Sequence, residues 1–437
     1  MPQQLFVQRR QALLEKMAPA SAAVIFSAPE VIRSNDSEYP YRQNSDFWYL
    51  TGFNEPQSAL LLIKSDEKHI HSILFNRLRD KQAETWTGRR LGQEAAPKKL
   101  HIDRALPFNE IALHLPQLFN GLDIIYHACG YHSGADELVF SALETLRKGA
   151  RQKLSAPATL TDWRPWVHEM RLFKSPDELA ILRQAGTISA LAHTRAMLIC
   201  RPGMYEYQLE GGIHHEFTRH GARYPAYSTI VGAGANGCIL HYTENESKLL
   251  DGELVLIDAG CELQGYAGDI TRTFPVNGKF TAPQRAVYDI VLEALNLALS
   301  LYRPGTTIRE VTDQVIRTMV SGLVRLGILT GDVDVLVEEQ AYRPYFMHGL
   351  SHALGLDVHD VGFLGHDRDR QLEPGMVITV EPGLYIAPDA DVPPQYRGIG
   401  IRVEDDIVIT IDGNENLTDG VVKDPDEIEA LMAEAKR

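Results

Sequence analysis

Cysteine is scarce in this chain, with four residues among 437, and none of the four lies in a CxxC spacing. Zinc sites built on thiolates and redox-active cysteine pairs both rely on such spacings. We therefore expect neither kind of site, and we expect Cys129, Cys200, Cys238 and Cys261 to be buried free thiols.

Positive charge is also in short supply, because 43 Lys and Arg residues stand against 58 Asp and Glu residues, a net charge of −15. Nucleic acids and anionic membrane surfaces are bound through Lys and Arg. The balance argues against both as main partners and favours small or uncharged ones.

Long apolar runs are absent too. None reaches the roughly 20 residues that a membrane-spanning helix needs. The opening segment, MPQQLFVQRRQALLEKM, lacks the apolar core of a signal peptide. We expect a soluble cytoplasmic protein that does not bind membranes.

The chain is long enough for two domains. Short apolar strands at 22–26, 59–64 and 71–76 alternate with helical stretches, which predicts an α/β domain over 1–172. A capping box at Ser175 and Glu178 predicts a long helix that ends near Cys200, and so a second domain over 173–437. Further capping boxes begin at Thr281 and Thr307.

Acidic residues end or follow several apolar strands of the second domain. Asp258 ends the run LVLI and Glu381 ends the run that begins at Met376. A second strand follows each run, and it carries Asp269 in one case and Glu404 in the other. This repeated pattern predicts a weak internal duplication of two related α/β halves.

Four carboxylates that converge repel one another, by about 4 kcal/mol per pair at a separation of ~4 Å and an effective dielectric of about 20. Two divalent ions would balance the four negative charges and leave room for a bridging hydroxide. We therefore predict a dinuclear metal site at Asp258, Asp269, Glu381 and Glu404.

One histidine would complete this ligand set. The segment from His348 to Asp360 offers His348, His352 and His359. Ligation that is mostly by oxygen suits manganese better than metals that prefer thiolates, although geometry alone leaves zinc and cobalt open.

The residue contexts LIDAGCE, GYAGDITRTF, HGLSHALGLDVHD, TVEPGLY and GIGIRVEDD closely resemble those of aminopeptidase P, the Xaa-Pro aminopeptidases of proteobacterial type. The resemblance extends to YPYRQNSDFWYLTGFNEP at 39–56 and HYTEN at 241–245, and so covers almost the whole chain. It implies the "pita-bread" fold of metallopeptidases: an α+β catalytic domain with an internal pseudo-two-fold duplication, behind the α/β N-terminal domain.

The resemblance also assigns the ligands. It implies that Asp269 and Glu404 bridge two metals, that Asp258 is a bidentate ligand of one, and that His352 and Glu381 complete the other. In that family a hydroxide held by both ions attacks the scissile carbonyl. Glu381 then moves the proton towards the leaving proline nitrogen.

Other residues match family positions around the metals. His241, His348 and His359 correspond to histidines that donate hydrogen bonds to the carbonyl oxygen and the oxyanion. Arg402 shares a strand face with Glu404, so it can pair with Asp258.

Two residues of the N-terminal domain, Asp36 and Trp86, match positions near the substrate pocket. In the family the equivalent tryptophan reaches the pocket of a neighbouring subunit. The resemblance thus implies a homotetramer that cleaves peptides with proline in second position, with the N-terminal domain contributing to oligomerisation and to the pocket.

Two alternatives remain open. Xaa-Pro dipeptidase (prolidase) has the same fold and five ligands but accepts dipeptides only. A non-catalytic pita-bread module that binds peptides, or a metal-free hydrolase of the creatinase type, would have lost the ligands, which are all present here.

Overall fold

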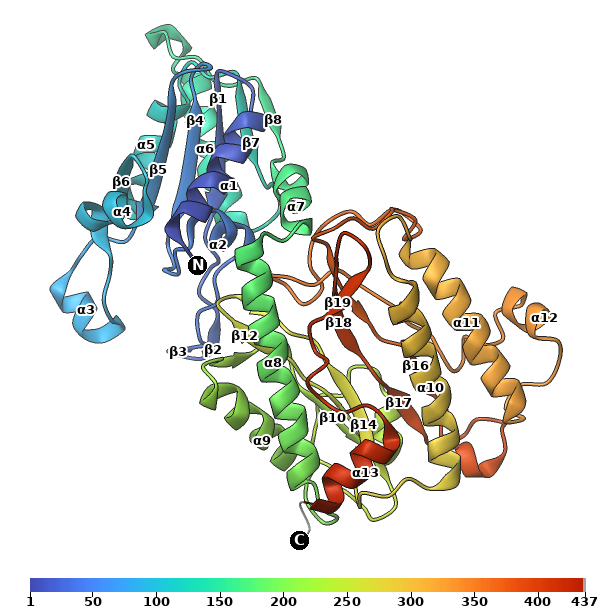
Figure 1. Ribbon diagram of the computed structural model, residues 1–437. Helices are drawn as coiled ribbons and strands as arrows, with labels where there is room; N and C mark the ends of the chain where they lie inside the picture. The colour runs from blue at the N-terminus through green and yellow to red at the C-terminus, as the bar shows by residue number, and fades with distance from the viewer. Residues whose placement is uncertain (435–437) are drawn as a thin grey trace. The chain divides into compact units, whose positions relative to one another are not determined.

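The computed structural model describes residues 1–434, and the chain divides into two compact units, residues 1–170 and 171–437. The sequence placed the boundary between residues 172 and 173. Figure 1 shows the elements of both units in order along the chain.

A six-stranded mixed sheet organises the first unit, in the order β6-β5-β4-β1-β7-β8. Its strands are β1 (Ser21–Phe26), β4 (Ala59–Lys64), β5 (Ile70–Asn76), β6 (Arg104–Pro107), β7 (Ile124–His127) and β8 (Thr159–Thr161). The predicted strands correspond to β1, β4 and β5. Because β7 runs parallel to both β1 and β8, these three strands end at the same edge.

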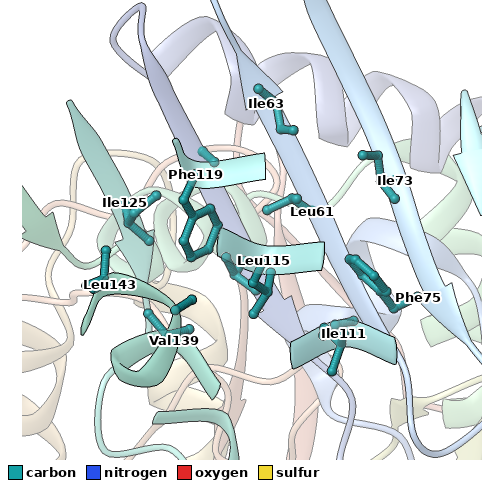
Figure 2. Close-up of a cluster of buried hydrophobic side chains, with 14 of the residues drawn as sticks. Leu61, Ile63, Ile73, Phe75, Ile111, Leu115, Phe119, Ile125, Val139 and Leu143 are labelled. Carbon is teal, nitrogen blue, oxygen red and sulfur yellow. The ribbon is translucent and has the colours of Figure 1, made fainter. Parts of the chain in front are cut away.

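The main core of this unit lies between one face of the sheet and helices α5 (Ile111–Phe119) and α6 (Ser133–Lys148). Figure 2 shows Leu115 and Phe119 of α5 pointing at Leu61 of β4 and Ile125 of β7. The remaining elements are helices α1 (Gln3–Lys16), α2 (Ser45–Thr51), α3 (Lys81–Thr87), α4 (Gly92–Leu100) and α7 (Arg164–Leu172), and a hairpin of β2 (Ile32–Ser34) and β3 (Ser37–Glu38).

Capping boxes begin three long helices of the second unit, as the sequence predicts. Ser175, Thr281 and Thr307 each accept a hydrogen bond from the backbone N–H three residues on. They start α8 (Pro176–Ile199), α10 (Ala282–Leu301) and α11 (Ile308–Arg325). The other helices of this unit are α9 (Glu206–Arg219), α12 (Val333–Glu338) and α13 (Pro425–Glu434).

Small antiparallel sheets form the rest of the second unit. One has the order β10-β11-β14, another β13-β12-β9, a third β15-β18-β19, and β16 pairs with β17. Their strands are β9 (Tyr224–Pro225), β10 (Ile230–Ala233), β11 (Leu254–Asp258), β12 (Cys261–Leu263), β13 (Tyr266–Ala267), β14 (Thr271–Pro275), β15 (Val377–Val380), β16 (Gly383–Tyr385), β17 (Gly400–Arg402), β18 (Asp405–Ile409) and β19 (Asn414–Asn416). The two predicted apolar runs are the antiparallel strands β11 and β15. Asp269 and Glu404 were predicted to lie in the second strand of each segment, but they lie between strands, Asp269 between β13 and β14 and Glu404 between β17 and β18.

Cysteine burial differs from the prediction. Cys200 and Cys261 are buried free thiols, but Cys238 is half-buried and Cys129 is exposed. Cys129 is exposed because it lies in the loop after β7 rather than inside an element. No helix within residues 1–434 has the length and apolar character to cross a membrane, and the cellular location stays a prediction.

We expect Leu115→Ala to lower the free energy of unfolding by about 2–5 kcal/mol, because it leaves a cavity beside Phe119 and Val139. Urea denaturation followed by circular dichroism measures the loss. Leu113→Ala is the matched control, since Leu113 lies in the same helix but is largely exposed. Equal losses in the two variants would contradict this account of the core.

Candidate metal centre

Strand pairing brings three of the four predicted acids together. Asp258 ends β11 and pairs with Thr271 of β14. Thr271 is two residues after Asp269, so this pairing brings Asp258 and Asp269 close together. The N–H of Glu404, which lies between β17 and β18, donates to the carbonyl of Thr271 at 3.0 Å. The Thr271 hydroxyl donates to Glu404 Oε2 at 2.6 Å, so one residue of β14 fixes both the backbone and the carboxylate of Glu404.

The remaining acid, Glu381, directly follows β15, and one histidine, His352, comes from the loop before that strand. Thr379 donates its N–H to the carbonyl of His352, and its hydroxyl lies 3.2 Å from Glu381 Oε1. His352 Nε2 lies 3.5 Å from Asp269 Oδ2 and 3.4 Å from Glu381 Oε1. Ligand atoms of Asp269, His352 and Glu404 all lie within 4.8 Å of one another.

Mutual repulsion and burial dominate the electrostatics of this cluster. Burial raises the pKa of Glu404 well above its usual range, with the charges of Asp269 and Glu381 adding to the shift. Burial likewise raises the pKa of Asp269, with the Asp258 charge adding to it, and raises that of Glu381 to about 7. The pocket therefore holds more negative charge than its own side chains neutralise.

His352 responds to the same charges in the opposite sense. Burial alone would lower its pKa, but contact with Asp269 and the charge of Glu381 raise the pKa to about 9. The acids around His352 therefore favour positive charge beside them. This donor set, carboxylate oxygens with one imidazole, fits two divalent cations, which would supply the missing positive charge.

Arg402 is the main cation of the protein itself at this site. Its guanidinium donates to Asp258 Oδ2 at 2.7 Å, the pairing that the sequence analysis considered possible. It also donates to the hydroxyls of Thr271 and Tyr385, at 3.0 and 2.9 Å. Arg402 thereby orients Asp258 while it offsets part of the acidic charge.

Tyr227 is a participant that the sequence analysis missed. Its hydroxyl lies 2.6 Å from Asp258 Oδ1 and 2.6 Å from Asp269 Oδ1, so its single proton serves two carboxylates. Burial raises the pKa of Tyr227 well above its usual value, with the charges of Asp258 and Asp269 adding to the shift. No sequence pattern marks this residue, because it lies in the irregular segment between β9 and β10.

A cavity of about 830 Å³ opens over the cluster. Three further predicted histidines line it: His241, His348 and His359. The ring of His359 lies 4.4 Å from the His352 ring, measured between centroids. Apolar side chains complete the walls, among them Ile230, Leu240, Val358, Phe363 and Leu364.

His348 is held as the neutral ring. Its Nδ1 donates to the carbonyl of Gly349 at 2.8 Å, so its Nε2 accepts from the Tyr385 hydroxyl, also at 2.8 Å. Burial and the Arg402 charge lower the pKa of His348 to about 4. Burial and the neighbouring His352 likewise lower the pKa of His359.

Asp36 and Trp86 belong to the first unit, and both are exposed. Asp36 lies in the turn between β2 and β3. Trp86 lies in α3, a helix with no buried residue, and 84% of its surface is exposed. Their assignment to a substrate pocket stays a prediction.

These features define a metallopeptidase, and the comparisons with known proteins agree. Residues 180–411 match the metallopeptidase family M24, and residues 6–126 match the N-terminal domain of aminopeptidase P. The chain therefore belongs to metallopeptidase family M24, in the branch that carries the aminopeptidase P N-terminal domain.

Several relatives match over nearly their full length. Xaa-Pro aminopeptidase of Escherichia coli strain K12 is 72% identical over 99% of this chain and 98% of its own. Zinc-substituted E. coli aminopeptidase P in complex with product has a TM-score of 0.99 at 72% identity, covering 100% of this chain and 99% of its own. Proline aminopeptidase P II from Yersinia pestis gives 0.99 at 74% identity, covering 99% and 100%. The predicted fold class is confirmed.

We expect Tyr227→Phe to weaken binding of divalent metal by about 10- to 100-fold, because it removes the hydroxyl that orients Asp258 and Asp269. Competition with a chromophoric chelator measures the affinity. Tyr266→Phe is the matched control, since that buried hydroxyl binds Glu178, outside the metal cluster. Unchanged metal affinity in Tyr227→Phe would show that the hydroxyl has no positioning role.

Proposed function

We propose that this chain is a metal-dependent aminopeptidase that releases the N-terminal residue from peptides with proline in second position. The observation that carries the proposal is that four acids and His352 line one cavity. This arrangement occurs in a chain similar over its full length to Xaa-Pro aminopeptidases.

The proposed ligands of two divalent ions are Asp258, Asp269, His352, Glu381 and Glu404. Asp269 and Glu404 would serve both ions, since each lies among the carboxylates of the other residues. When bound, two such ions would lower the pKa of a water molecule, so that it becomes a hydroxide nucleophile, and would polarise the carbonyl group that is attacked. We propose manganese as the natural metal, because oxygen ligands dominate.

Glu381 is the proposed proton carrier. Glu381 lines the cavity and lies 3.4 Å from His352, beside the water that the two ions would hold. A carboxylate in that position can take a proton from the water and return it to the leaving proline nitrogen.

His241 and His359 are proposed to bind the substrate, and His348 and Arg402 are proposed to position the groups around it. His241 and His359 line the cavity with exposed rings, so each can donate to a carbonyl oxygen or to a developing oxyanion. His348 is fixed through the Tyr385 hydroxyl to Arg402, which in turn holds Asp258.

Proline suits this kind of site. The peptide bond before proline carries no N–H, and the proline ring fixes the backbone. Peptidases that rely on a hydrogen bond from the N–H of the residue after the cleaved bond therefore fit proline poorly. The apolar walls around Leu240 and Val358 offer surface for such a ring. Similarity to Xaa-Pro aminopeptidases favours this activity over that of a dipeptidase, and the intact acids favour it over a non-catalytic module.

We expect chelation to abolish hydrolysis of the tripeptide Arg-Pro-Pro and two equivalents of manganese per chain to restore it. The dipeptide Ala-Pro should be cleaved far more slowly. Release of free N-terminal residue measures both rates. Full activity after chelation would contradict the metal requirement, whereas a preference for Ala-Pro would indicate a prolidase.

We also propose that the protein acts as a homotetramer in which Trp86 serves the pocket of a neighbouring subunit. The support is the exposure of this large ring on a helix without buried residues, beside Arg89. Tryptophan and arginine are enriched where subunits make their strongest contacts. Asp36 is proposed to contribute to the pocket in the same way.

Trp86→Ala is therefore expected to lower kcat/KM for Arg-Pro-Pro by about tenfold or more while metal content stays unchanged. Size-exclusion chromatography with light scattering should find a tetramer for the unaltered protein. Phe140→Ala, an exposed aromatic of the same unit, is the control. A fully active monomer would contradict the shared site.

A further inference from the structure

A second cluster of metal-ligating side chains lies in the first unit. His127 is the last residue of β7, Cys129 follows two residues later, and Asp136 is in the first turn of α6. These residues lie at the edge where the parallel strands β1, β7 and β8 end, which is where open α/β sheets commonly bind ligands. The peptidase reaction proposed above uses none of them.

The three side chains converge. One ligand atom from each lies within 4.8 Å of the other two. His127 Nε2 lies 2.8 Å from Asp136 Oδ1, and the N–H of Gly130 donates to Asp136 Oδ2 at 3.0 Å. The loop backbone thus holds the carboxylate facing the imidazole. His132 is committed elsewhere, since its Nδ1 accepts from the N–H of Ala135.

Burial of the histidine is a second, independent observation. His127 is 2% exposed, and within residues 1–434 its Nδ1 has no hydrogen-bond partner. A buried imidazole without a full set of partners is costly unless something else binds it.

The ligand chemistry selects the kind of ion. Thiolate, imidazole and carboxylate each bind zinc, and zinc sites with three protein ligands keep a fourth position open. The oxygen-rich cluster of the second unit differs, because it contains no sulfur ligand. Binding replaces the thiol proton by a metal–sulfur bond and releases that proton to solvent. Cys129 is exposed, so its side chain can rotate to shorten the distances to the ion.

We propose that His127, Cys129 and Asp136 bind one zinc-class divalent ion, independently of the dinuclear centre. The ion would link the end of β7 to the first turn of α6. The sequence analysis expected no zinc site with a thiolate ligand, because no CxxC spacing is present. It missed this site because the three ligands come from a strand end, a loop and a helix.

Cobalt is the probe, because a cobalt–thiolate bond gives a charge-transfer band in the near ultraviolet that oxygen and nitrogen ligands do not give. The full chain is first loaded with manganese, and Co²⁺ is then added in steps. We expect the band to saturate at one equivalent per chain and Zn²⁺ to displace it.

Cys129→Ser should remove the band while hydrolysis of Arg-Pro-Pro is unchanged. Asp136→Asn should weaken Co²⁺ binding by tenfold or more and keep the band at high metal concentration. Cys238→Ser is the control, since Cys238 is the other cysteine that is not fully buried. The Cys238→Ser variant should keep the charge-transfer band. Absence of the band from the unaltered protein, or its persistence in Cys129→Ser, would overturn the proposal.

Discussion

Repulsion among four carboxylates is the constraint on which the second unit depends. Asp258, Asp269, Glu381 and Glu404 face one cavity, and the burial of Asp269 and Glu404 makes their negative charge expensive. The raised pKa values of Asp269, Glu381 and Glu404 express this cost in the metal-free cluster. Arg402 offsets only part of it, through its ion pair with Asp258. Two divalent cations would supply the rest, so the charges that are costly to bury would also create the affinity for metal.

The fold supplies rigidity for this arrangement. Each acid lies at or next to a strand end, and backbone pairing fixes its neighbours: Thr271 holds Glu404, and Thr379 lies against Glu381. Hydroxyl groups then bridge the charged groups, with Tyr227 between two acids and Tyr385 between Arg402 and His348. Residues from the two halves of the unit therefore meet without any acid relying on a mobile loop for support.

Local rules explain how much the sequence predicted. Capping boxes depend on residues three positions apart, so the starts of α8, α10 and α11 followed directly from Ser175, Thr281 and Thr307. Strand alternation placed Arg402 on the face of Glu404, and tertiary contacts pair it with Asp258. The acids were found because a carboxylate at the end of an apolar strand is costly unless it is compensated. Tyr227 and the His127 cluster were missed, because tertiary contacts alone bring them to their partners, and the exposure of Cys129 follows from a loop path that no short pattern encodes.

The most direct test of the central claim is the electron paramagnetic resonance spectrum of the metal-free protein as Mn²⁺ is added. Carboxylates shared by two ions would couple their electron spins. The account predicts uptake of two equivalents per chain and a multiline spectrum of a spin-coupled pair. The spectrum of isolated Mn²⁺ at full loading, or saturation at one equivalent, would contradict it.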